Sequence, residues 1–476
     1  MKKTGLAILM AATLLSCNKE NLQSKLPVIP TRPVVNYLPV TVTLDESHPG
    51  YKIPETFEGL SYETSLLVDS PEFLNENNQV LIQLIKNLGR GVLRIGGNSS
   101  DLTKWGWGPR TEKTPPKTLT TSDIDRLSAF DKAIGWPVVF GLNLGSGNAA
   151  TAANEAAYVK KSLQNNLYVL QSGNEPDMFS TGPRTAKYNY KNYQYEWGEF
   201  FLAIRKETPD APFGGPDVTP FNNEWITSFA ANENKNIKLI DGHYYVTGPA
   251  SLASINYNDI LTQNTKLAAY LGTMHTEASK YHIPFRVSEC NSVFGGGKNG
   301  VSDVFASALW ALDFMWEVAG YKGQGINFHG GGRSFFYSPI TIENGSFIAK
   351  PEYYAMLAFK YGAVGQTMVP ITFTHPEYNL SAHACVNADG TYAITLINKE
   401  VESSFAFTIQ LSKAASSVQV ARLTAPSITS ASTTFAGNMV NEDGTFTPNI
   451  TEQYTPNQNT FVVNVPAGSA VVITIK

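Results

Sequence analysis

Two glutamates carry the clearest chemical signal in the sequence. Glu175 follows an apolar run that starts at Tyr168, and Glu289 ends a second short apolar run that starts at Pro284. Both patterns are typical of a parallel barrel strand with an acidic side chain at its carboxyl end, where barrel enzymes hold their reacting groups. Two carboxylates that face each other across a glycosidic bond can cleave it.

A series of apolar runs between about residues 57 and 358 predicts the barrel that would position these glutamates. Each run ends in polar or Gly-rich residues, and helix-like segments separate the runs. This alternation predicts a (β/α)8 TIM barrel, with Glu175 on the fourth strand and Glu289 on the seventh. The expected strands cover 57–63, 91–98, 137–143, 168–175, 211–217, 237–245, 284–289 and 325–332.

Two of the intervening segments have apolar residues at helical spacing. One runs over 72–88, and Gly89 is expected to end it. The other is an amphipathic run that reaches Ala319, with Ser302 or Asp303 as its cap and Gly320 as its end.

After about Tyr361 the pattern changes to short alternating runs separated by turn residues. This pattern predicts an antiparallel β-sandwich domain, and we expect the similar early strand Val40–Leu44 to join it. The expected domain order is a signal peptide over 1–16, a tether over 17–35, a sandwich strand over 36–50, the catalytic barrel over 51–360 and the sandwich over 361–476.

The first residues are typical of an export signal. A positive start at Met1-Lys2-Lys3 precedes a short apolar stretch over 6–15. The residues before Cys17 resemble a bacterial lipobox, so we expect a lipid on Cys17 and an exported protein held at a bacterial outer membrane, on its periplasmic face or at the cell surface. An ordinary signal peptide with an incidental cysteine is the alternative.

Composition argues against several other classes of protein. The net charge of −4 over 476 residues and the lack of a basic cluster exclude a nucleic-acid partner. The seven histidines lack ligand spacing, so no metal and no cofactor are expected. The sequence contains no nucleophile elbow, which argues against a hydrolase that uses a Ser-His-Asp triad. Cys290 and Cys385 fall in different expected domains, so no disulfide between them is expected. Cys290 directly follows Glu289, and we expect it to be a buried, unreactive thiol rather than a nucleophile.

Several motifs in shared order resemble glycoside hydrolase family 79, the family of β-glucuronidases and heparanase. The resemblance covers essentially the whole chain after the signal. It implies a retaining hydrolase with Glu175 as acid/base and Glu289 as nucleophile, with the pKa of Glu175 raised. The motifs are Arg94-Ile-Gly-Gly-Asn98, Asn174-Glu175-Pro176, His243-Tyr-Tyr245, Ser288-Glu289 followed by Gly295-Gly-Gly297, Val301 to Asp313, Asn327-Phe-His329-Gly and Pro351-Glu-Tyr-Tyr354.

The same resemblance suggests roles for other residues. Asn174 is expected to donate to the sugar 2-hydroxyl, or else to be a turn residue, and Tyr245 to hold Glu289 by a hydrogen bond. Glu63 and Asp101 would accept sugar hydroxyl protons or cap loops. The remaining expectations are that Asn98, His329 and Tyr337 line the sugar site, that Arg94 pairs with a carboxylate near Glu289, that His243 and Tyr244 pack in the barrel, and that Trp105 and Trp107 stack on a sugar or pack a loop.

One position departs from the family pattern. Where the glucuronidases often have a Tyr that binds the substrate carboxylate, this chain has Phe294, followed by Gly295 and Gly296. The glycine amides can still form an anion-binding turn, but one hydrogen-bond donor is lost.

The expected activity is that of a retaining exo-β-glucuronidase. Its substrate would be an oligo- or polysaccharide with a terminal β-linked uronic acid. The alternatives are a retaining β-glycosidase for another sugar, an endo-acting relative, and a surface lipoprotein that binds glycans without turnover.

Overall fold

The computed structural model describes residues 35–262, 265–332, 335–456 and 458–476. Cys17 and the expected signal and tether therefore lie outside the described residues, apart from Val35. The description that follows concerns the compact unit Tyr37–Lys476.

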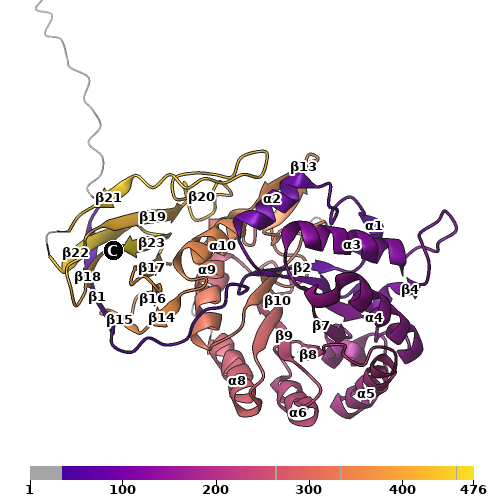
Figure 1. Cartoon of the computed structure of the whole chain (residues 1–476). Coiled ribbons are helices and arrows are strands. Elements are labelled where there is room, and N and C mark those ends of the chain that lie inside the picture. The colour runs from indigo at the N-terminus through magenta and orange to yellow at the C-terminus, as the bar shows by residue number, and fades with distance from the viewer. Residues whose placement is uncertain (1–34, 263–264, 333–334, 457) are drawn as a thin grey trace, which may run out of the picture. The chain divides into compact units, whose positions relative to one another are not determined.

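The centre of this unit is a barrel of parallel strands, and the predicted fold class is confirmed (Figure 1). The strands follow the order β7-β6-β3-β2-β11-β10-β9-β8. A bridge between Leu170 and Phe213, with Leu170 N donating to Pro212 O, closes the ring between β7 and β8. The strands are β2 (Gly59–Glu63), β3 (Val92–Gly96), β6 (Val138–Leu142), β7 (Leu167–Ser172), β8 (Gly214–Val218), β9 (Leu239–Thr247), β10 (Phe285–Val293) and β11 (Ile326–His329).

Helices surround this ring in the usual crossover arrangement. Capping chemistry sets some of their ends: α3 begins at a capping box formed by Thr120 and Asp123, and it ends at Gly135 with a left-handed φ of 72°. The helices are α1 (Leu66–Asp69), α2 (Gln79–Asn87), α3 (Thr121–Ile134), α4 (Ala149–Leu163), α5 (Tyr190–Glu207), α6 (Asn223–Glu233), α7 (Tyr257–Leu261), α8 (Thr265–Tyr281), α9 (Phe305–Gly320) and α10 (Pro351–Gly362).

Two helix predictions were partly wrong. The helix expected from residue 72 begins only at Gln79, because the Asn-rich segment before it forms turns and the Asn78 side chain accepts from Leu81 N. The expected amphipathic run is α9, which is capped at Val304 and is buried on nearly all sides. It is buried because α10 and the β-domain cover it, with Phe305 N and Ala306 N donating to Ser430 and Ile428 carbonyls.

The C-terminal β-domain is a sandwich of two sheets, with strand orders β15-β1-β18-β22 and β14-β16-β17-β23-β19-β20. The N-terminal strand β1 lies in the first sheet, where it pairs antiparallel to β15 and parallel to β18. The strands are β1 (Tyr37–Leu44), β14 (Thr367–Val369), β15 (Ile371–Phe373), β16 (Leu380–Val386), β17 (Tyr392–Asn398), β18 (Ser404–Gln410), β19 (Val418–Thr424), β20 (Thr434–Phe435), β21 (Glu452–Tyr454), β22 (Thr460–Val465) and β23 (Ser469–Ile475).

The barrel and the sandwich share one continuous apolar core on one side of the larger sheet. Val472 and Leu423 of that sheet pack with the residues that cover the barrel, whereas the space between the two sheets is a separate core. An ion pair between Asp313 on α9 and Lys399 crosses the same junction at 2.5 Å. The sandwich therefore packs directly on the barrel.

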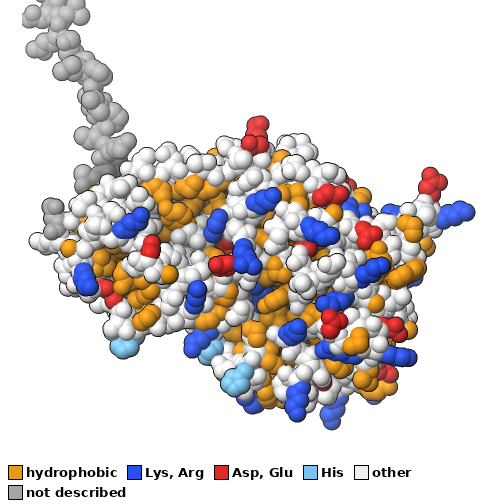
Figure 2. Space-filling model, viewed as in Figure 1, with side chains coloured by type: hydrophobic (Ala, Val, Ile, Leu, Met, Phe, Trp, Pro, Cys, Tyr) orange, Lys and Arg blue, Asp and Glu red, His pale blue; other side chains and the backbone are white. Residues whose placement is uncertain are grey.

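Two further two-stranded sheets are present: β4 (Lys104–Gly106) pairs parallel to β5 (Thr118–Thr120), and β12 (Ile340–Glu343) pairs antiparallel to β13 (Ser346–Ala349). On the face drawn in Figure 2, Lys and Arg side chains are scattered among Asp and Glu side chains. None of the helices in the described ranges combines the length and the apolar character that a membrane crossing requires.

Candidate active site

The two glutamates meet at one end of the barrel. Glu175 lies three residues beyond β7 in a left-handed conformation (φ 49°), and its amide donates to Asp217 O at 2.9 Å. Glu289 was expected at the end of its strand, but it lies within β10. The strand continues to Val293 because it pairs with the long strand β9. One carboxylate oxygen of each glutamate and one ring nitrogen of His243 all lie within 4.8 Å of one another.

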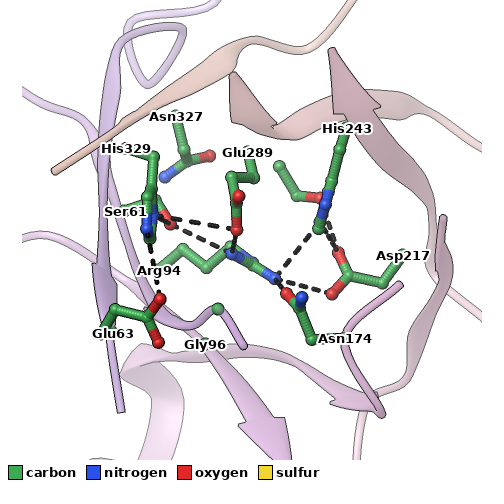
Figure 3. Close-up of polar contacts among 12 residues, drawn as sticks. Ser61, Glu63, Arg94, Gly96, Asn174, Asp217, His243, Glu289, Asn327 and His329 are labelled. Carbon is green, nitrogen blue, oxygen red and sulfur yellow. Dashed lines mark hydrogen bonds and ion pairs between the residues drawn. The ribbon is translucent and has the colours of Figure 1, made fainter. Parts of the chain in front are cut away.

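Arg94 organises the floor of this site from the centre of the barrel (Figure 3). The side chain is fully buried on β3, where an unpaired charge would be costly. Its guanidinium is paired with two carboxylates, as expected for one of them. The donations are from Nη1 to Glu289 Oε2 at 2.7 Å and Ser61 Oγ at 3.1 Å, from Nη2 to Asp217 Oδ2 at 2.7 Å and Asn174 Oδ1 at 2.9 Å, and from Nε to Gln171 Oε1 at 2.9 Å.

His243 connects Asp217 to Glu175. Its Nε2 lies 2.9 Å from Asp217 Oδ1, and its Nδ1 lies 3.0 Å from Glu175 Oε1. Although burial disfavours a charged imidazole, the negative charges of Asp217 and Glu289 and the hydrogen bonds raise the pKa of His243 well above its ordinary value. When protonated, the ring donates to both carboxyl groups, and Glu175 Oε2 is then the oxygen that can carry a proton.

The pKa of Glu289 lies below its ordinary value. Burial by itself would raise this pKa, but the positive charges of His329, His243 and Arg94 outweigh that effect, together with a hydrogen bond from Tyr245. The Tyr245 hydroxyl donates to Glu289 Oε1 at 2.7 Å, which is the contact expected from the sequence. Both oxygens of Glu289 are thus held by donors, and the group is a fixed carboxylate.

The pKa of Glu175 is shifted in the opposite direction. Burial raises it, and the negative charge of Glu289 adds to this shift, although the hydrogen bond and the charge of His243 lower it in part. Two nearby carboxyl groups with pKa values pushed apart can act as one acid and one base.

A pocket of about 380 Å³ opens above these groups. It contains most of the residues expected to bind a sugar. The lining residues are Glu63, Asn98, Glu175, Met178, Thr219, Pro220, Phe221, Tyr245, Glu289, Phe294, Gly295, Gly296, His329, Phe335 and Tyr337.

Four of the expected sugar-binding residues are already engaged in hydrogen bonds. Glu63 accepts from the amide and the hydroxyl of Ser99, and His329 Nδ1 lies 2.9 Å from Ser61 Oγ. Asn174 donates from Nδ2 to Asn98 Oδ1 at 3.2 Å. All four side chains are fixed in place before any ligand arrives.

Asp101 does not line this pocket but borders an adjoining cavity, which Glu175 also lines. Its carboxylate accepts from the backbone amides of Leu144, Gly145 and Asn174 at 2.7 to 2.9 Å, and burial raises its pKa to about 7. This is the loop-capping role that had been the alternative for Asp101. It holds the loop before Glu175 in place.

The Gly-rich turn after β10 offers free donors. Gly295 and Gly296 have left-handed φ values of 87° and 93°, which glycine tolerates without strain. Within the described residues neither amide donates to an acceptor, and both glycines line the pocket. The Phe294 ring beside them lies against Gly248 and edge-on to Tyr245.

Sequence reasoning missed Asp217 and His243 as parts of the site. His243 had been taken as packing, and Asp217 only as the end of a strand. Their partners are far away in sequence, and Asp217 Oδ1 also accepts from Ser288 Oγ at 2.8 Å and Gln171 Nε2 at 2.6 Å. No local pattern announces such a network.

The cluster of Glu175, His243 and Glu289 has the donor atoms of a metal site. Both ring nitrogens of His243 already lie at hydrogen-bond distance from a carboxylate oxygen, 3.0 Å from Glu175 and 2.9 Å from Asp217. The arrangement suits proton transfer between carboxyl groups better than metal ligation.

Comparisons with known proteins agree with this geometry. The family model described as the glycosyl hydrolase family 79 C-terminal beta domain matches residues 380–472. The chain is 24% identical over 368 residues to a β-glucuronidase of Neurospora crassa, which covers 67% of this chain and 65% of that protein. It is 22% identical over 372 residues to heparanase-like protein 3 of Arabidopsis thaliana, which covers 71% and 68%.

A β-glucuronidase of Aspergillus niger is 25% identical over 348 residues, covering 63% of this chain and 64% of that protein. The chain thus spans a little under two thirds of the length of these two fungal relatives. Among solved structures, a 4-O-α-L-rhamnosyl-β-D-glucuronidase from Fusarium oxysporum has a TM-score of 0.74 at 18% identity, covering 91% of this chain and 100% of that one. This last likeness concerns the fold alone.

Proposed function

The chain belongs to glycoside hydrolase family 79, and from that premise we propose that it is a retaining exo-β-glucuronidase that acts on glycans by double displacement. The observation that carries the proposal is the spacing of at most 4.8 Å between a carboxylate oxygen of Glu175 and one of Glu289. Retaining enzymes hold their two carboxyl groups about 5 to 5.5 Å apart, whereas inverting enzymes leave room for a water between them.

In the first step Glu289 attacks the anomeric carbon and forms a glycosyl ester. The bond from that carbon to the leaving oxygen breaks as Glu175 Oε2 gives its proton to the leaving oxygen. In the second step Glu175, now a carboxylate, takes a proton from water, and the resulting oxygen attacks the same carbon and releases Glu289.

The electrostatics of the site favour this alternation. While Glu289 is charged, it helps to keep the pKa of Glu175 above its ordinary value, which favours the protonated acid that the first step needs. The ester in the intermediate is neutral, so that contribution is lost and the pKa of Glu175 falls. Glu175 then changes from acid to base at the step that needs a base.

The free amides of Gly295 and Gly296 support a uronate in the pocket. Among the described residues that line the pocket, none is Lys or Arg, so the amides of Gly295 and Gly296 and the ring of His329 are among the donors that a carboxylate could meet there. Phe294 supplies no donor, and for this reason a neutral β-glycoside is the competing substrate.

We further propose export and lipid attachment at Cys17. Growth of the expressing bacterium with an alkyne fatty acid should label the wild-type protein and not the Cys17→Ser variant. Equal labelling of both would contradict this part of the proposal.

The activity is tested with a panel of 4-nitrophenyl β-glycosides that includes the glucuronide, glucoside, galactoside and xyloside. We expect the glucuronide to be cleaved with the highest kcat/KM, and the Glu289→Gln and Glu175→Gln variants to lose turnover. Glu224→Gln, an exposed carboxyl-to-amide change on α6, is the matched control. Cleavage of a neutral glycoside alone would overturn the uronate assignment, and binding without turnover of any glycoside would overturn the activity.

A further inference from the structure

A second cavity, of about 500 Å³, adjoins the reaction pocket. The two share Asn98, Glu175 and Met178, so Glu175 borders both. From there the second cavity runs outward past Leu102, which is 60% exposed, to Ser146. This continuity gives the reaction site an extension that a single sugar ring in the pocket would leave empty.

Ser146 also borders a third cavity of about 190 Å³, which lies between the β4 strand and the start of α4. Each cavity thus shares lining residues with the next, and we name this series of cavities, from Glu175 to Trp105, the β4 groove. Figure 1 shows β4 and α4 at the same side of the barrel, and Trp105 Nε1 donates to Asn154 Oδ1 on α4 at 2.7 Å.

Glu155 borders the far part of the β4 groove and has no partner. It is 6% exposed, and no hydrogen bond or ion pair joins its carboxyl to another described residue. Burial raises its pKa to about 8. Its oxygens are not sealed from the cavity, so a hydrogen-bonding group of a ligand placed there can reach the carboxyl.

An aromatic platform stands at the outer end of the groove. Trp107 is 68% exposed, and its ring is held edge-on against Trp105 at 6.5 Å and Tyr158 at 5.5 Å between centroids. Trp105 is itself fixed by its bond to Asn154. A large apolar ring kept rigid and open to solvent is suited to contact a ligand rather than to fill a core.

We propose that the β4 groove binds further sugars of the substrate, so that the enzyme acts on oligosaccharides more efficiently than on small glucuronides. Sugars have an apolar face that can lie on Trp107 and hydroxyl groups that can donate to Glu155. The inference rests on the proposed function for the sugar in the reaction pocket. It adds a preference for longer substrates to that function.

The test compares kcat/KM for 4-nitrophenyl β-glucuronide with two series of oligosaccharides of two to five sugars. In one series the glucuronate is at the non-reducing end, and in the other it is internal. For the wild type, kcat/KM is expected to rise with length in one of the two series. That series identifies whether the groove binds the sugars of the leaving group or the sugars on the other side of the cleaved bond.

Trp107→Ala should lower kcat/KM for the longest oligosaccharide about three- to tenfold more than for the aryl glucuronide, the size of one lost aromatic contact. Glu155→Ala should also reduce the dependence on length. Tyr195→Ala, an equally exposed aromatic on α5, is the matched control and should leave the length dependence unchanged. An unaltered length dependence in Trp107→Ala would overturn the proposal.

Failure of the proposed function can be distinguished from failure of the groove proposal. If the wild type cleaves no glucuronide of any length, that function fails, and the groove is then tested by calorimetric titration of the same oligosaccharides. Tighter binding to the wild type than to Trp107→Ala supports the groove. Equal binding, or no binding to either, overturns it.

Discussion

Replacement of His243 by Gln tests whether a charged imidazole sets the properties of both glutamates. In the structure His243 donates to Glu175 at 3.0 Å and to Asp217 at 2.9 Å. Its positive charge lowers the pKa of Glu289 and, in part, that of Glu175. Gln has no charge and cannot place two donors where the ring nitrogens lie.

The expected loss follows from these contacts. A hydrogen bond to a charged group contributes about 1.5 to 3 kcal/mol. Loss of one such bond in the transition state lowers kcat/KM about 10- to 150-fold. Loss of the bond to Asp217 also leaves that buried carboxylate with fewer donors, although Arg94, Ser288 and Gln171 still contact it.

The pH profile has a more specific expectation. The acid limb of kcat/KM reports Glu289 losing its charge, and the alkaline limb reports Glu175 losing its proton. Without the cation at 243 the pKa of each carboxyl rises, so the alkaline limb of the His243→Gln profile should move to higher pH, and the acid limb should move up toward the measured range.

The measurement is the kcat/KM profile from pH 3 to 9 with the aryl glycoside that the enzyme cleaves best. It compares the wild type with His243→Gln and His375→Gln. His375→Gln is the matched control, because His375 pairs with Glu377 on the exposed surface of the β-domain. A His243→Gln profile that superimposes on that of the wild type after scaling would refute the cationic role of His243.

Three further outcomes are expected. Lys399→Met should lower the free energy of unfolding in urea by about 3 to 5 kcal/mol, because it removes the closest cation from the buried Asp313 carboxylate and leaves it with His383 at 3.7 Å, and Lys399→Met/Asp313→Leu should recover most of this loss. Burial alone would raise the pKa of Asp313, but Lys399 and His383 lower it. The ion pair therefore stabilises the wild type at neutral pH, and this stabilisation is lost as the pH falls through the acid range. A difference in the free energy of unfolding between wild type and Lys399→Met that does not change over that range would contradict this prediction. Phe294→Tyr should raise the ratio of kcat/KM for the glucuronide to that for the glucoside by about tenfold or more, whereas Phe336→Tyr, away from the pocket lining, should not; an unchanged ratio in Phe294→Tyr would show that the ring does not face the carboxylate.

The barrel could be predicted because its signal repeats. Strands such as β3 and β6 are apolar runs that end abruptly, and the structure places them close to the expected residues. The start of α2 and the burial of α9 were harder to predict from the sequence. The first depends on local turns, and the second depends on a domain that is distant in sequence.

The site could be predicted where one residue carries the chemistry by itself. Glu175, Glu289 and the bond from Tyr245 to Glu289 follow from motifs. Asp217 and His243 could not be found in this way, because no local motif marks them. Their roles follow from contacts with Arg94, Glu175 and Ser288, which only the fold brings together. Glu155 is a similar case, since only burial in the β4 groove makes its lack of a partner visible.

The central claim is that Glu289 forms a covalent bond to the sugar while Glu175 moves the proton. The most direct measurement is mass spectrometry of the protein after reaction with a 2-deoxy-2-fluoro β-glycosyl fluoride of the sugar that it cleaves best. The account predicts one added glycosyl group, on the peptide that contains Glu289, and none in Glu289→Gln. A glycosyl group on Glu175 or on another residue, or turnover of the fluoride without any labelled protein, would contradict it.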